Sequence, residues 1–112
     1  MNVNRGDIVL LPVPFSDQSS RKVRPAIVIS NDTINRMSED IILVPLTSVL
    51  KEVPYSIIIS QENLSEGKLI TTSRARMDKV FTAHKSLIRM NIGTLKHDIL
   101  RKIRQELIGA VS

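Results

Sequence analysis

Two short apolar runs, separated by a polar and basic stretch, limit most strongly how this chain can fold. The runs are Ile8–Val13 and Ala26–Ile29, and both are rich in valine, isoleucine and leucine. Runs of this length and composition, bounded by glycine, proline and aspartate, predict β-strands. Pro12, Pro14 and Pro25 have no backbone N–H, so we expect them to confine strand pairing to edges or strand starts. The sequence therefore predicts two strands joined by a basic loop.

The remainder of the chain predicts more strands and one final helix. Apolar runs typical of strands recur at 41–46, 55–60 and within 69–81. Polar segments separate them and predict a short helical turn or loops, at 31–40, 48–54, 61–67 and 84–89. Leucine and isoleucine then recur every three or four residues from 94 to 110, which predicts a helix with Thr94 as its N-cap. We therefore expect a mainly β fold with a C-terminal helix that covers a strongly curved sheet.

Length and charge limit the function. A chain of 112 residues predicts a single domain, 1–112, and a hydrophobic content of 42% argues against disorder. The net charge of +5 favours a polyanionic partner, although lysines that merely keep the protein soluble would explain it too. The chain has only three aromatic residues, Phe15, Tyr55 and Phe81, so a base-stacking platform is excluded. Binding to a nucleic acid would depend on charge and hydrogen bonds.

Cysteine is absent, and no segment resembles a secretory signal or a membrane span. A disulfide framework and a thiolate metal site are therefore excluded, which fits a reducing compartment. Asp7, Pro12 and Pro14 interrupt the only apolar stretch near the N-terminus. We expect a soluble, cytoplasmic protein that does not associate with a membrane.

Three segments resemble the MazF/PemK toxins, which are ribosome-independent endoribonucleases of bacterial toxin–antitoxin pairs. The first segment contains Gly6-Asp7-Ile8-Val9, Pro14-Phe15, Lys22-Val23-Arg24-Pro25-Ala26 and Val28-Ile29-Ser30. The others are Val44-Pro45-Leu46-Thr47-Ser48 and Asp78-Lys79-Val80-Phe81-Thr82, in which Lys79 and Phe81 depart from the usual glutamine and basic residue. The resemblance extends over nearly the whole chain. It implies a small SH3-like barrel of the MazF/CcdB type and a homodimer whose two subunits form the RNA groove.

The same resemblance implies that Arg24 and Thr47 are the catalytic residues. RNA cleavage without a metal requires activation of the ribose 2′-hydroxyl, stabilisation of charge on the phosphorane and a proton for the leaving oxygen. An arginine directly before a strand can present a planar fork to the phosphate, and a threonine hydroxyl can donate to a phosphoryl oxygen. Each residue alone also has an ordinary explanation, Arg24 as a surface residue and Thr47 as a cap of a turn.

The two loops beside these residues are the predicted RNA-binding surface. The residues expected to contact RNA are Gln18, Ser19, Ser20, Arg21, Lys22, Ser48 and Lys51. Basic side chains position the phosphates, whereas hydrogen bonds from residues such as Gln18, Ser48 and Glu52 would select bases. The alternating charges Arg74, Arg76 and Asp78 predict a charged strand face, which is either simply solvated or a further RNA contact.

The general base is left open by the sequence. Arginine stays protonated at neutral pH, so Arg24 is a poor base. An imidazole is the usual side chain for this role, but His84 lies where the family pattern has no catalytic residue, and His97 lies on the polar face of the predicted helix. The aspartates have no metal-ligand spacing and no glycine-rich phosphate loop is present, so we expect neither a metal nor a cofactor.

These observations predict a toxin of a type II toxin–antitoxin system. It would be a sequence-specific, metal-independent endoribonuclease that cleaves single-stranded mRNA through 2′-hydroxyl attack and inhibits translation and growth. The expected partners are single-stranded RNA, a second copy in a homodimer, and a cognate antitoxin with an acidic, partly disordered tail. Two alternatives are a non-enzymatic CcdB-like toxin that binds DNA gyrase and a catalytically decayed member that only binds nucleic acid.

Overall fold

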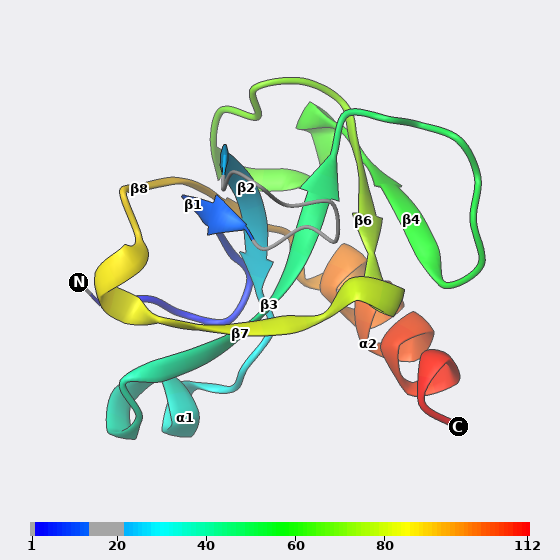
Figure 1. Cartoon of the computed structure of the whole chain (residues 1–112). Coiled ribbons are helices and arrows are strands. Elements are labelled where there is room, and N and C mark those ends of the chain that lie inside the picture. Colours follow the sequence, from blue (N-terminus) through cyan, green and yellow to red (C-terminus); the bar gives the residue numbers. More distant parts are fainter. Residues whose placement is uncertain (1, 14–21) are drawn as a thin grey trace.

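The protein folds as a strongly curved antiparallel sheet with one long helix packed against it (Figure 1). This structure is a computed structural model, and it describes residues 2–13 and 22–112. Its strands are β1 (Asp7–Val13), β2 (Lys22–Val28), β3 (Asp40–Thr47), β4 (Ser56–Ile59), β5 (Leu64–Gly67), β6 (Ser73–Arg76), β7 (Phe81–His84) and β8 (Met90–Leu95). The helices are α1 (Asp32–Met37) and α2 (His97–Ala110), with short 3₁₀ turns η1 (Gln61–Asn63), η2 (Met77–Lys79) and η3 (Lys85–Leu87).

The sheet is built around β3, which changes partner along its length. In space the strands follow the order β4, β6, β3, β2, β1, β8, β5, and neighbouring strands are antiparallel. On one edge, the first half of β3 pairs with β7, and its last two residues, Leu46 and Thr47, pair with β6. The sheet therefore curls into a half-barrel that ends in a C-terminal helix, and this confirms the predicted fold class.

Pro12, Pro25 and Pro45 lie inside central strands, but the nitrogen of each faces a place where no ladder continues. The amide of Ile29 donates to the carbonyl of Ile42 at 2.9 Å, so odd-numbered residues of β2 direct their backbone groups toward β3. Pro25 belongs to this set, and the β2–β3 ladder ends just before it, at Ala26 and Pro45. Proline has no N–H to extend the ladder. The sequence prediction that Pro25 confines pairing to an edge or a strand start is therefore wrong, because Pro25 lies inside the central strand β2, although the β2–β3 ladder does end beside it.

Pro45 and Pro12 follow the same rule. Pro45 directs its nitrogen toward the other edge of β3, between the last pair with β7 and the first pair with β6. Pro12 lies on β1 just beyond the end of the ladder with β8, which stops at Leu10 and Met90. At either position, a backbone N–H would point to an edge that has no partner strand. Proline therefore removes no inter-strand hydrogen bond there.

The two faces of the sheet pack into separate hydrophobic clusters. Side chains from α2, including Ile99, Leu100 and Ile103, cover one face together with Ile27 and Val44. The opposite face is filled by residues of β1, β2, β3 and β7, among them Val9, Leu11, Ala26, Val28, Ile41 and Leu43. Apolar side chains removed from water on both faces supply the main driving force for this fold.

The final helix begins three residues later than the sequence predicts. Thr94 is not the N-cap, because it belongs to β8 and its hydroxyl donates to the carboxylate of Asp7 at 3.0 Å. Asp7 is only 4% exposed, and a buried carboxylate without a hydrogen-bond donor is costly. The Thr94 hydroxyl therefore stabilises the protein more as a partner of Asp7 than it would as a helix cap. Helix α2 starts at His97, and the sequence analysis missed β8 altogether, because Asn91, Gly93 and Thr94 interrupt its apolar residues.

Two further segments differ from the sequence predictions. The segment 61–67, predicted as a turn, contains η1 followed by β5. Gly67 of β5 lies opposite Gly93 of β8, and a Cβ on Gly67 would meet the Ile92 carbonyl oxygen at 2.2 Å. The segment 69–81, predicted to hold one or two strands, holds β6 and the start of β7, and its predicted alternation is interrupted by η2, which contains Asp78 and Lys79. In the described part of the chain, no helix is long and apolar enough to span a membrane.

Candidate functional site

Arg24 and Thr47 lie on neighbouring strands where these strands begin to separate. The last pair of the β2–β3 ladder is Ala26 with Pro45, and the same register continued by two residues brings Arg24 opposite Thr47. Because side chains alternate along a strand, both residues belong to the face that α2 does not cover. The two predicted catalytic residues therefore lie just beyond the end of the β2–β3 ladder, on the face of the sheet that carries the second hydrophobic cluster.

A rigid strand holds Arg24. It pairs with Leu11 of β1 and is half-buried, although Lys22 and Val23 before it are exposed. The sequence assigned Lys22 to a loop, whereas in the structure Lys22 is the first residue of β2 and pairs with Val13. Lys22 belongs to the same face of β2 as Arg24, because the side chains of residues two apart project from the same face of a strand. The predicted contacts Gln18, Ser19, Ser20 and Arg21 lie outside the described residues.

Thr47 ends β3 with its hydroxyl held at one position. The amide of Val49 donates to Thr47 Oγ1 at 3.2 Å, which turns the chain into the next loop. This is the only hydrogen bond of that hydroxyl within residues 2–13 and 22–112, so its hydrogen is available to a ligand. Ser48 and Lys51 follow in the loop and are both exposed.

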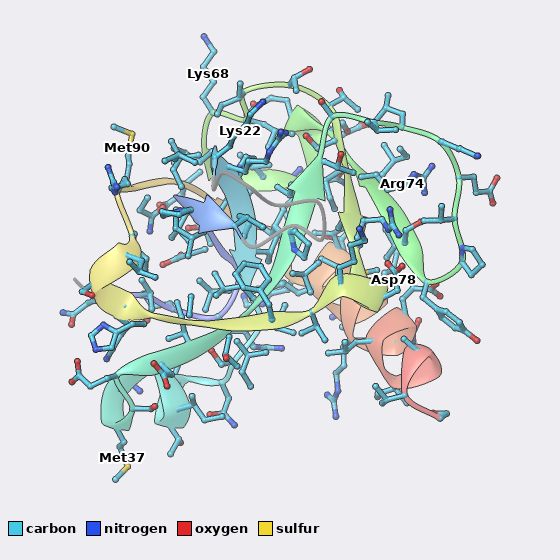
Figure 2. All side chains as sticks on the ribbon, in the orientation of Figure 1. Lys22, Met37, Lys68, Arg74, Asp78 and Met90 are labelled. Carbon is cyan, nitrogen blue, oxygen red and sulfur yellow. The ribbon has the colours of Figure 1, made fainter. Side chains whose placement is uncertain are left out.

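Arg74 is a residue of this region that the sequence analysis misjudged. The strand pattern predicted a solvated or RNA-facing arginine, but Arg74 is only 8% exposed. It pairs with Thr47 across β3 and β6, and its guanidinium reaches the loop between β3 and β4 (Figure 2). No local signal distinguishes it from Arg76, which lies on the same strand and is paired with Asp78.

The pair of Arg76 and Asp78 changes the pKa of both groups. Arg76 Nη2 lies 2.6 Å from Asp78 Oδ2, and Nε lies 2.8 Å from Oδ1. These hydrogen bonds lower the pKa of Asp78 below its ordinary value and raise the pKa of Arg76. The pair lies at the surface, so it contributes little to stability.

His84 lies at the far end of β3 from Thr47. It pairs with Asp40, the first residue of that strand, and its Nδ1 accepts a hydrogen bond from the Ser86 amide at 3.1 Å. Its Nε2 lies 3.6 Å from a carboxylate oxygen of Glu39. Within one subunit, His84 is therefore not part of the site that contains Arg24.

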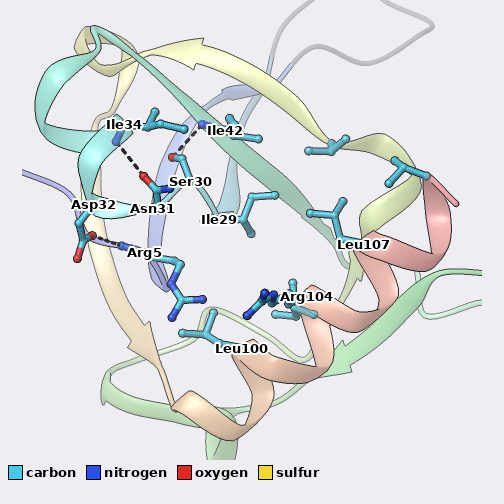
Figure 3. Close-up of a pocket in the computed structure, with 13 residues that line it drawn as sticks. Arg5, Ile29, Ser30, Asn31, Asp32, Ile34, Ile42, Leu100, Arg104 and Leu107 are labelled. Carbon is cyan, nitrogen blue, oxygen red and sulfur yellow. Dashed lines mark hydrogen bonds between the residues drawn. The ribbon is translucent and has the colours of Figure 1, made fainter.

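A cavity of about 820 Å³ lies on the opposite face of the sheet (Figure 3). It is lined mainly by apolar side chains of α1, β3, α2 and the segment after β2, such as Ile29, Ile42 and Leu107, and Arg5 and Arg104 point toward its centre. Of the predicted catalytic and RNA-binding residues that the structure describes, none contributes to its lining. In the described ranges, no three histidine, aspartate or glutamate side chains gather in a way that could hold a metal ion.

A family comparison agrees with the fold. The model of the PemK-like, MazF-like toxins of type II toxin–antitoxin systems matches residues 4–111. The chain therefore belongs to this family of toxins, as its sequence motifs predicted. No curated protein matches the chain.

Solved structures of the same family share the fold. An endoribonuclease in complex with its cognate antitoxin, from a mycobacterial species, is 20% identical with a TM-score of 0.79, and the match covers 97% of this chain and 94% of that one. The MazE–MazF complex of Deinococcus radiodurans is 19% identical with a TM-score of 0.79 and coverages of 99% and 97%. The Mycobacterium tuberculosis toxin MazF-mt6 is 14% identical, with a TM-score of 0.72 and coverages of 92% and 95%. At these identities the likeness establishes the half-barrel fold with its C-terminal helix.

Proposed function

We propose that this toxin is a metal-independent endoribonuclease that cleaves single-stranded RNA by attack of the ribose 2′-hydroxyl. The observation that carries the proposal is that Arg24 and Thr47 lie on neighbouring strands, each two residues beyond the last pair of the β2–β3 ladder, Ala26 with Pro45, and on the same face of the sheet. The related mycobacterial protein of the same fold is named an endoribonuclease, which supports the same chemistry here. Membership of the PemK-like, MazF-like family favours RNA cleavage over gyrase binding.

In the proposed reaction the 2′-oxygen bonds to phosphorus and the bond from phosphorus to the 5′-oxygen breaks. Arg24 stabilises the negative charge on the pentacoordinate phosphate through its guanidinium, and the free hydroxyl hydrogen of Thr47 bonds a phosphoryl oxygen. The proton of the 2′-hydroxyl leaves to a base that the chain does not identify, and the 5′-oxygen takes up a proton. The products carry a 2′,3′-cyclic phosphate and a 5′-hydroxyl.

The proposed RNA-binding surface surrounds Arg24 and Thr47. Lys22 at the start of β2 and Ser48 and Lys51 after β3 are exposed on either side of it, and Lys22 and Lys51 would neutralise phosphates. The sequence adds Gln18, Ser19, Ser20 and Arg21 to the same surface. Because phosphate contacts carry no sequence information, base selection would depend on polar groups of these two segments.

Incubation of the purified protein with a long single-stranded RNA in excess EDTA tests the proposal. Cleavage at defined positions, with a cyclic phosphate on one end and a 5′-hydroxyl on the other, is the expected result. A 2′-deoxy substitution at the cut site should abolish cleavage, because it removes the nucleophile, and should leave most of the binding. Activity that is lost on chelation and restored by Mg²⁺ would contradict the mechanism.

The proposal also includes a cognate antitoxin and a homodimer. A related toxin of the same fold was solved with its cognate antitoxin, and the net charge of +5 favours an acidic, partly disordered tail as the inhibitor. Such a tail would compete with RNA for the basic surface. Expression of the toxin alone should arrest growth, and co-expression of the neighbouring antitoxin should restore it. Harmless overexpression of soluble wild-type protein would argue strongly against a toxin.

A further inference from the structure

The guanidinium of Arg74 leaves β6 and ends inside the loop between β3 and β4. We call residues 48–55 the β3–β4 loop. Arg74 Nε and Nη2 donate to the carbonyl oxygen of Leu50 at 3.2 and 3.1 Å. Two donors on one acceptor hold the middle of the loop at a set distance from β6, and charged donors make stronger hydrogen bonds than neutral ones.

A second contact of Arg74 holds the far end of the same loop. Nη1 donates to Ser56 Oγ at 2.9 Å, and this hydroxyl in turn donates to the carbonyl oxygen of Val53 at 2.5 Å. Since a serine hydroxyl has a single hydrogen, the donation to Val53 leaves its lone pairs to accept from Arg74. The loop is thus held at Leu50 directly and at Val53 through Ser56.

The loop has little else to give it a shape. It contains no helix or strand, and five successive residues, 48–52, are exposed. Val49 and Leu50 are 65% and 45% exposed, which is unusual for large apolar side chains next to the polar Ser48 and Lys51. A loop of this kind would lose conformational entropy whenever a ligand ordered it. Arg74 removes much of that cost in advance, because it orders the loop in the free protein.

We propose that Arg74 is a positioning residue for the RNA site. It presets the β3–β4 loop beside Thr47, so that the apolar side chains of Val49 and Leu50 meet unstacked bases while Ser48 and Lys51 meet the backbone. This assignment rests on the proposed function as an endoribonuclease. Unstacked bases bind to apolar surfaces, which aromatic side chains often provide. Because this chain has only three aromatic residues, aliphatic side chains such as Val49 and Leu50 would take that role.

Arg74 itself is not available as an RNA contact. Its Nε, Nη1 and Nη2 atoms are all engaged within the protein, and the residue is almost completely buried. Its influence on RNA therefore passes through the loop. A residue that acts in this way should change the binding of substrate more than the chemical step, because Arg24 and Thr47 remain in place.

The test compares Arg74→Met with wild type, and Arg76→Met is the matched control. Arg76 lies two residues away on the same strand, but its guanidinium binds Asp78 and not the loop. We expect Arg74→Met to raise KM for a short single-stranded RNA about tenfold or more, and to change kcat less than about threefold. Hydrogen–deuterium exchange should become faster at the amides of residues 48–53, and Arg76→Met should leave exchange and KM unchanged.

Ser56→Ala provides a second, milder variant, because it breaks only the contact that leads to Val53. If Arg74→Met does not fold, Ser56→Ala should show the same pattern with a smaller rise in KM. Unchanged exchange in the loop, or a fall in kcat at constant KM, would overturn the proposal. If the wild-type protein cleaves no RNA, the proposed function fails together with the RNA role of the loop. Faster exchange in Arg74→Met would then still establish the clamp on the loop.

Discussion

His84 of β7 lies opposite Asp40, the first residue of β3, and Thr47 is the last residue of β3, seven positions later. A strand rises about 3.3 Å per residue, so His84 and Thr47 are roughly 23 Å apart along β3. A general base must come within hydrogen-bond reach of the proton that it removes. Within one subunit, His84 is therefore too far from Thr47 to act as the general base.

The variant His84→Ala should consequently remain active. We expect its kcat/KM on single-stranded RNA within about threefold of wild type, because the side chain contacts only Ser86 and Glu39 at the surface. The measurement is a cleavage assay between pH 5 and 9. A dead His84→Ala protein, or a wild-type pH profile with an ionisation near about 6.5 that this variant removes, would refute the assignment.

The variant Arg24→Lys should be nearly inactive. Lysine keeps the positive charge but lacks the planar fork that binds two phosphate oxygens, and loss of one preorganised donor typically costs on the order of 10²–10³ in rate. RNA affinity should stay within about tenfold of wild type, since the other cationic residues of the surface are unchanged. Single-turnover cleavage and equilibrium binding of a 2′-deoxy RNA separate the two effects. Full activity of Arg24→Lys would show that the fork is not needed.

Two substitutions of Thr47 separate its hydroxyl from its shape. Thr47→Val removes the donor to the phosphoryl oxygen and the acceptor for the Val49 amide, so we expect kcat to fall on the order of 10²-fold. Thr47→Ser keeps both hydrogen-bonding functions and should lose less than about tenfold. The comparison requires equal thermal stability of the two proteins. Equal activity of Thr47→Val and Thr47→Ser would exclude a catalytic hydroxyl.

Asp78 should make stability depend on pH, but only weakly. Its folded-state pKa is lowered by hydrogen bonds from Arg76, so the stabilisation is present above the unfolded pKa of about 3.9 and disappears as the pH falls through the folded-state value. The side chains of Asp78 and Arg76 are 37% and 23% exposed, and an exposed ion pair contributes less than about 1 kcal/mol to the free energy of unfolding. Urea denaturation at pH 7 should show wild type slightly more stable than Asp78→Asn. The difference should shrink as the pH falls from the unfolded pKa through the folded-state pKa of Asp78, and a difference that stays constant over that range would contradict the ion-pair explanation.

Gly67→Ala should destabilise the fold severely. Gly67 has a φ of +86°, and a Cβ there would lie 2.4 Å from the Gly93 Cα and 2.2 Å from the Ile92 carbonyl oxygen. Because these atoms are backbone, relief requires β5 and β8 to separate, and we expect a loss of at least about 2 kcal/mol. Gly109→Ala is the control: its Cβ would meet the exposed, movable ring of Tyr55 at 2.8 Å. Thermal denaturation of both variants checks the contrast.

The sequence singled out Arg24 and Thr47 as a proposed catalytic pair because Arg24 stands just before an apolar run and Thr47 ends another, each in a recognisable motif. In the structure the two residues lie on the neighbouring strands β2 and β3, and their catalytic role remains a prediction. Arg74 was misjudged, because alternation along a strand reports which face a side chain occupies but not whether a distant loop covers that face. The late start of α2 has a similar cause, since the demand of buried Asp7 for a partner outweighed the helix-capping tendency of Thr94.

By itself the sequence determined the fold class, because short β-branched runs and one amphipathic segment admit few arrangements other than a curved sheet with a terminal helix. It also determined where ladders must stop, since Pro25 and Pro45 have no N–H to continue them. Only the tertiary structure decided which residues meet. Thr94 bonds Asp7 from 87 residues away, and Arg74 reaches Leu50 across 24. The local sequence pattern limits how each strand can pair, but it does not determine which strand is the partner. The partner depends on which arrangement buries the apolar residues of the whole sheet.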